Sequence, residues 1–143
     1  MKFCFRRMIR VILIGYSMLL SYWMIFGFGR IARADYMYNL KPFHTINQYL
    51  HINNFNPNIW IVNLAGNIGV FVPFGILIPL TFGGRYMKLL GTFLSGLFVL
   101  EVLQLITKRG SFDIDDFILN TIGVTIGYGI YRMAMGWVDS EKL

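Results

Sequence analysis

Charged side chains are scarce in this chain of 143 residues. Asp, Glu, Lys and Arg together make up 14% of it, whereas an average soluble domain carries roughly 25%. The chain also has a single cysteine, Cys4, which excludes an intramolecular disulfide and any metal site built from several cysteines. This composition excludes a disordered tail, a coiled coil and a nucleic-acid-binding arm, so we expect no nucleic-acid partner.

Hydrophobic residues are correspondingly abundant, at 56% of the chain, with 17% aromatic residues and a mean hydropathy of +0.57. A domain of this length has too small an interior to bury that much apolar surface in water. The composition therefore predicts a small integral membrane protein. Residues 1–143 are expected to form one membrane domain, whose first partner is the lipid bilayer.

Four apolar runs are long enough to cross a bilayer, whose hydrocarbon core of about 30 Å needs about 20 residues per helix. The predicted spans are residues 11–29, 60–82, 89–107 and 117–138. The first two contain no charge, the third contains Glu101, and the fourth contains Arg132 near its end. The sequence thus predicts an all-α bundle of four transmembrane helices, with both termini on the same side.

The distribution of Lys and Arg predicts the orientation of these spans. Eight basic residues lie on the side of the termini and five on the opposite side, which favours cytoplasmic termini. Residues 30–58, between the first two spans, are then extracytoplasmic. The helical spacing of Ile46, Tyr49 and Leu50 predicts a short helix there, lying at the membrane interface.

The first apolar run has a second interpretation, as a secretory signal peptide, because Ala32-Arg33-Ala34 follows the small-residue pattern of a cleavage site. The run has 19 residues, whereas the apolar core of a signal peptide has roughly 7–15. The length favours a retained span. Cleavage would leave the orientation of the other three spans unchanged.

Polar side chains within the spans fall into pairs that share a helix face, at spacings of three or four residues. The pairs are Asn63 and Asn67, Glu101 and Gln104, and Asp116 and Asn120. At about 1.5 Å of rise per residue, the inner members of these pairs lie about 5–10 Å below the outer ends of their helices. Three helices therefore place polar groups in the outer third of the membrane, which predicts a shared site that faces outside.

Glu101 carries the largest energetic cost of these residues, because a carboxylate at the centre of a span costs about 2.5–3.5 kcal/mol on insertion scales. It should face the bundle, and Arg109 or Lys108 in the following loop are candidate partners. The Asn and Gln amides either fasten helices or bind a ligand, since interhelical hydrogen bonds contribute only about 0.6 kcal/mol. The acids that precede the fourth span, Asp115 above all, are candidates to cap that helix.

Proline and glycine mark the expected shapes of the helices. Pro73 lies inside the second span and should kink or loosen it, because proline removes one helical hydrogen bond; Gly75 adds freedom nearby. Gly123 and Gly127 have the spacing typical of close helix packing in membranes.

Three blocks of the sequence resemble the VanZ-like family. They are residues 39–43; residues 63–75, with Asn67, Phe71, Pro73, Phe74 and Gly75; and residues 101–127, with Glu101, Gln104, Arg109, Asp113, Asp115, Asp116, Asn120, Thr121 and Gly123. The resemblance covers about residues 39–129. It implies a small multi-spanning protein of the bacterial cytoplasmic membrane, in a family whose namesake is associated with low-level teicoplanin resistance.

Three classes of function fit these residues. The first is binding or masking of a surface lipid or lipid-linked wall precursor at the cell envelope, which would alter glycopeptide susceptibility. The second is a membrane-embedded enzyme acting on such a lipid, with Glu101 as general acid or base and Arg109 holding a phosphate. Asp113 and Asp116 would then be candidate Mg²⁺ ligands, although the sequence requires no cofactor. The third is an oligomeric transporter.

Overall fold

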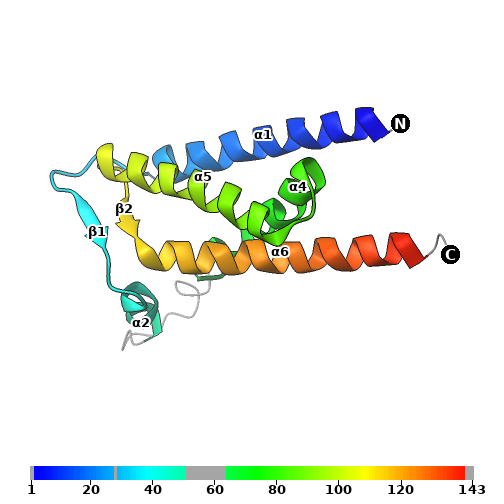
Figure 1. The fold of residues 1–143 in the computed structure, drawn as a ribbon. Helices are drawn as coiled ribbons and strands as arrows, with labels where there is room; N and C mark the ends of the chain where they lie inside the picture. The colour runs from blue at the N-terminus through cyan, green and yellow to red at the C-terminus, as the bar shows by residue number, and fades with distance from the viewer. Residues whose placement is uncertain (1, 28, 51–63, 141–143) are drawn as a thin grey trace.

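The computed structural model of the chain describes residues 2–27, 29–50 and 64–140, and these are mostly helical (Figure 1). Four longer helices are α1 (Lys2–Phe26), α4 (Val72–Phe82), α5 (Tyr86–Ile106) and α6 (Ile114–Ser140). The shorter elements are helix α2 (His44–Leu50) and strands β1 (Met37–Asn39) and β2 (Ser111–Asp113). Residues 64–69 are also helical and lead into α4.

Three helices of the described part are long and apolar enough to cross a membrane: Cys4–Phe26, Leu64–Phe82 and Tyr86–Ile106. They coincide with the first three predicted spans, so the chain is a helical membrane protein. Helix α6 has 27 residues, which is ample length for a fourth span, but it is not among these three helices. The fourth span and the orientation of the termini stay predictions.

The two termini lie at one end of the bundle, and β1, β2 and α2 lie at the other (Figure 1). Helices α1, α5 and α6 run along the length of the molecule, and α4 packs among them. Helix α2 confirms the short helix that the spacing of Ile46, Tyr49 and Leu50 predicts. The end that carries α2 is called the α2 end below.

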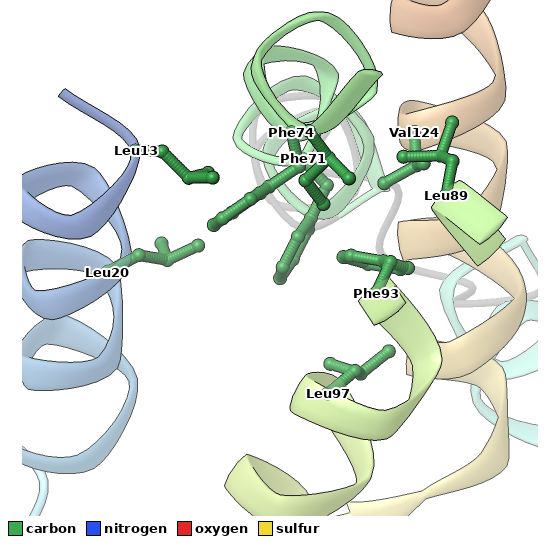
Figure 2. Packing of buried hydrophobic residues seen from close by; sticks show 9 residues of the cluster. Leu13, Leu20, Phe71, Phe74, Leu89, Phe93, Leu97 and Val124 are labelled. Atoms are coloured by element: carbon green, nitrogen blue, oxygen red, sulfur yellow. The ribbon is translucent and has the colours of Figure 1, made fainter. Parts of the chain in front are cut away.

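The apolar core lies between α1, α4 and α5 and reaches α6 at Val124 (Figure 2). Its centre is a group of three rings, Phe71, Phe74 and Phe93, whose centroids are 5.5 to 6.0 Å apart. Helix α1 contributes Leu13 and Leu20, while most of its other apolar side chains are exposed. Such a helix is stable only where hydrocarbon surrounds it.

The second apolar helix is interrupted at residues 70–71, just before Pro73. The amide of Phe74 donates to the Phe71 carbonyl instead of continuing the helical pattern to Val70. The Val70 carbonyl accepts a 2.7 Å hydrogen bond from the Tyr16 hydroxyl of α1. A neighbouring helix thus satisfies the backbone group that the proline-induced break leaves free, as a membrane interior requires.

Three glycines bring α6 against the broken helix backbone to backbone. A Cβ added to Gly123 would collide with the Ile68 carbonyl, and one added to Gly127 would collide with the Val72 carbonyl. One added to Gly75 would meet the backbone of α6. This close approach brings residues 64–69 beside the first turns of α6.

Strands β1 and β2 form a parallel pair, with Tyr38 opposite Phe112 and Asn39 opposite Asp113. Sequence periodicity did not indicate them, because three residues are too few to show an alternating pattern. The pair joins the segment after α1 to the loop between α5 and α6. It therefore holds the extracytoplasmic segment of the prediction against the start of α6.

Candidate functional site

One face of α5 is apolar along most of its length and polar at the α2 end. Its buried residues are Leu89, Phe93, Leu97, Glu101 and Gln104, spaced three or four residues apart as one helix face requires. Glu101 has no exposed surface. The carboxylate thus enters the bundle because it continues the stripe that packs the core.

Among the residues that the structure describes, one oxygen of Glu101 has a hydrogen-bond partner and the other has none. Its Oε2 accepts from the backbone N–H of Asp113 at 3.4 Å, a long contact. Its Oε1 is buried and has no partner in the part of the chain that the structure describes. Buried polar atoms are nearly always hydrogen-bonded, so this free oxygen marks a place where a ligand group would be stabilised.

Asp115 binds the segment around the start of α2 to the bundle. One carboxylate oxygen accepts from the amide of Phe43 at 2.6 Å, and the other accepts from the amides of Thr45 at 2.8 Å and Ile46 at 3.2 Å. The residue has no exposed surface. We expected Asp115 to cap the fourth span, but it instead satisfies backbone amides at the start of α2, because the fold places that segment beside α6.

Asp113 supplies the cap that we had assigned to Asp115. Its Oδ1 accepts from the amide of Asp115 in the first turn of α6 at 2.9 Å. The same oxygen accepts from Asn39 Nδ2 at 3.0 Å, and Oδ2 accepts from the Thr45 hydroxyl at 2.6 Å. Both carboxylate oxygens are therefore occupied by protein groups, which leaves Asp113 little capacity for a ligand.

Asp116 lies in the first turn of α6 and Asn120 in the second. Asp116 Oδ1 accepts from Asn67 Nδ2 at 3.1 Å, so the second and fourth predicted spans meet at this polar layer. Asn120 is 2% exposed, and its Oδ1 has no partner among the described residues. We refer to Asn67, Glu101, Asp113, Asp115, Asp116 and Asn120 as the polar cluster.

Gln104 and Arg109 belong to the junction with α1. The Gln104 amide donates to the Met24 carbonyl at 2.7 Å, and so does the guanidinium of Arg30 at 2.8 Å. The guanidinium of Arg109 lies 4.9 Å from the centre of the Phe26 ring and donates to the Arg30 carbonyl at 3.4 Å. Both side chains thus fasten the end of α1.

Arg109 is therefore not the partner of Glu101 that its place in the sequence suggested. Lys108, the other candidate, donates to the Ala34 carbonyl at 2.7 Å and lies over the Tyr36 ring. Arg30 is instead a basic residue whose charge favours the ionised forms of both Glu101 and Asp116. Sequence reasoning missed Arg30 because it follows the first span, seventy residues before Glu101.

Two further residues of the site, Asn39 and Thr45, were not singled out by their chemistry. Asn39 is the first residue of the first block that resembles the family. That resemblance is the feature of the sequence that could have identified Asn39 as a site residue. Asn63, a predicted site residue, lies outside the described residues. Among the residues that the structure describes, no group of three or more His, Cys, Asp or Glu could hold a metal ion.

The sequence was compared with known proteins. The VanZ/LLP1 family matches residues 10–135. "Protein VanZ" of Enterococcus faecium is 29% identical over 110 residues, which is 73% of this chain. The aligned region spans 65% of that relative's own length. No solved structure matches the chain.

Proposed function

Because the chain belongs to the VanZ/LLP1 family, we propose that it acts at the cell envelope by binding the polar group of a surface lipid or lipid-linked wall precursor in its polar cluster. In this proposal α6 is the fourth membrane span, and the α2 end faces outside. Occupation of the cluster would change the access of glycopeptides such as teicoplanin to their target.

One observation carries the proposal: two hydrogen-bond acceptors on neighbouring helices are buried and have no partner in the described part of the chain. They are Glu101 Oε1 on α5 and Asn120 Oδ1 on α6. Leaving such a group buried and unpaired costs about 1–3 kcal/mol, and more for a charged group. A ligand that brings hydroxyl, amide or ammonium donors would recover this free energy.

The remaining members of the polar cluster hold its framework in place. Asp115 and Asp113 use their oxygens to fix α2, β1 and the start of α6, and Asp116 is bound by Asn67. Both carboxylate oxygens of Asp113 and of Asp115 are thus bonded, whereas Glu101 and Asn120 each keep one acceptor with no partner among the described residues. That division is typical of a binding site whose first contacts are kept rigid by their surroundings.

A membrane-embedded enzyme is the second candidate, and the buried carboxylate of Glu101 favours it. A general acid or base needs a carboxyl group with one oxygen available to the substrate, and Glu101 has one. The Glu101→Gln change separates the two functions, because glutamine keeps an acceptor oxygen but cannot exchange the proton. Binding should survive this change in large part, whereas acid–base chemistry should be lost.

The test is complementation in a bacterium that lacks the protein, scored by teicoplanin and vancomycin susceptibility and by the membrane lipid profile. Glu101→Ala and Asn120→Leu remove the free acceptors, and we expect both variants to lose the wild-type phenotype at matched membrane levels. Thr125→Val is the control, because it removes an exposed hydroxyl of α6 outside the polar cluster. It should behave as wild type.

Two outcomes decide between the candidates. If Glu101→Ala and Asn120→Leu insert normally and keep the full phenotype, the polar cluster is not the binding site. If Glu101→Gln alone abolishes the phenotype and leaves an unprocessed lipid, the enzyme replaces the binding protein as the better function.

A further inference from the structure

A cavity of about 390 Å³ lies between α1, α4 and α5. This is within the roughly 300–1,000 Å³ typical of sites for small molecules. One face of each helix lines it, including Ser17 and Leu20 of α1, Phe74 of α4, and Phe93, Gly96 and Leu97 of α5. Figure 2 shows Leu13 and Leu20 pointing from α1 toward the phenylalanines.

Small residues on facing helices create this space. Ser17 and Ser21 of α1 and Gly96 of α5 all line the cavity, and a Cβ on Gly96 would meet nothing within 4 Å. Small residues usually let membrane helices approach closely. Here they leave open space at the level of the cavity, although α1 and α5 are in contact further along, where the Gln104 amide donates to the Met24 carbonyl.

The chemistry of the lining selects a hydrocarbon occupant. The hydroxyl of Ser17 donates to the Leu13 carbonyl, and that of Ser21 donates to the Ser17 carbonyl, both at 2.7 Å. These hydroxyls are satisfied within α1, and the other lining side chains are almost all apolar. Apolar cavities stay empty of water. The lining belongs to the three helices that suit a membrane, where hydrocarbon chains are the neighbouring molecules.

The cavity and the polar cluster follow one another along α5. Phe93 and Leu97 line it, and the same buried face of α5 continues to Glu101, about 6 Å further along the helix. The lining of α5 runs from Thr92 to Leu100, or about 12 Å of helix. A hydrocarbon chain that extends along the cavity to Leu100 would therefore direct its polar end toward the level of Glu101.

We propose that this cavity binds one hydrocarbon chain of a lipid whose headgroup carries hydrogen-bond donors and reaches the polar cluster. The part of the inference that concerns the headgroup rests on the proposed function. The part that concerns the hydrocarbon chain rests on the cavity alone. Phosphatidylethanolamine and phosphatidylglycerol both supply such donors, as an ammonium group and as hydroxyls. Phosphatidylcholine has the same chains and no N–H or O–H donor.

Photo-crosslinking of the full chain in phosphatidylcholine nanodiscs tests the proposal. The probe is phosphatidylethanolamine with a diazirine on one acyl chain, and peptide mass spectrometry locates the crosslinks. We expect saturable crosslinks at Leu20, Phe93 and Leu97, above the level at Met18, which is 69% exposed on α1. Unlabelled phosphatidylethanolamine or phosphatidylglycerol should displace the probe better than phosphatidylcholine does, and whichever competes more strongly identifies the headgroup.

Two glycines of α5 provide a matched pair of variants. Gly96→Leu fills the cavity, and we expect it to lower cavity crosslinking by about tenfold. Gly91→Leu adds the same side chain where a Cβ also meets nothing within 4 Å, but Gly91 does not line the cavity. Its crosslinking should match wild type.

The outcomes separate the chain site from the headgroup site. The cavity does not bind a hydrocarbon chain if crosslinking is unchanged in Gly96→Leu, or if it is no stronger at Leu97 than at Met18. The polar cluster would then be judged by its own variants. If Gly96→Leu blocks crosslinking but Glu101→Ala leaves the headgroup preference intact, the cavity binds the hydrocarbon chain and Glu101 does not bind the headgroup. Loss of that preference in Glu101→Ala, with chain crosslinking retained, supports both.

Discussion

At the scale of single residues, one carboxylate connects two distant parts of the chain. Asp115 accepts hydrogen bonds from three backbone amides around the start of α2, about seventy positions earlier in the sequence. Hydrogen bonds to a charged group contribute about 1.5–3 kcal/mol each. Asp115 is therefore a structural residue of the site, while Glu101 and Asn120 provide its free acceptors.

Replacing Asp115 should release α2 from the bundle. We expect Asp115→Ala to lower the free energy of unfolding by roughly 2–3 kcal/mol, because three backbone amides lose their acceptor and water, which reaches this partly exposed segment, replaces it only in part. Hydrogen exchange at Phe43, Thr45 and Ile46 should accelerate by about tenfold or more. Asp35→Ala, which removes an exposed carboxylate from the same segment, should change neither quantity; equal effects of the two variants would contradict the assigned role.

At the scale of elements, the contact between α6 and the broken helix depends on having no side chains where the backbones touch. Gly123 lies against the Ile68 carbonyl and Gly127 against the Val72 carbonyl. Loss of this contact would move Asn67 away from Asp116, so the helix packing and the geometry of the polar cluster are coupled. Pro73 contributes to this contact because it interrupts the helix at the level where α6 packs against it.

Replacing glycines of α6 with alanine should distinguish the effect of close helix packing from the effect of helix propensity on stability. Gly123→Ala should destabilise the protein by about 1–3 kcal/mol, because the added methyl group collides with backbone. Gly129→Ala, on the same helix, meets nothing within 4 Å and should be neutral or stabilising by about 0.5–1 kcal/mol. Thermal unfolding in detergent measures both, and a Gly123→Ala variant as stable as wild type would rule out the tight contact.

At the scale of the whole molecule, both termini lie at one end of the bundle and the polar cluster lies toward the other (Figure 1). This arrangement fits an even number of membrane crossings, with α6 as the fourth. The excess of Lys and Arg on the side of the termini indicates that this side is cytoplasmic. The polar cluster would then be accessible from outside the cell.

Thiol labelling in intact cells measures this orientation, because Cys4 is the one native cysteine. A membrane-impermeant reagent should label Cys4 only after the cells are permeabilised. In a Cys4→Ser background, Asp35→Cys should be labelled in intact cells, and a cysteine tag at the C-terminal end should be protected. Protection of Asp35→Cys together with labelling of the tag would reverse the topology and place the polar cluster inside.

The sequence by itself determined that this is a helical membrane protein of the VanZ/LLP1 family, and it indicated where three of the helices cross. It also predicted the break before Pro73 and the helix at residues 44–50. These features depend on local runs of residues, because transfer of a helix into hydrocarbon is set by its own composition and a proline acts on its own turn.

Only the tertiary structure decided which groups meet. It assigned Asp115 to the start of α2, directed Arg109 toward Phe26, placed Arg30 near Glu101, and paired β1 with β2. It also opened the cavity beside α1. These contacts join residues far apart in the chain, and their partners are set by how the helices pack. A local pattern shows that a side chain is polar and faces inward, but the group it meets depends on the packed bundle.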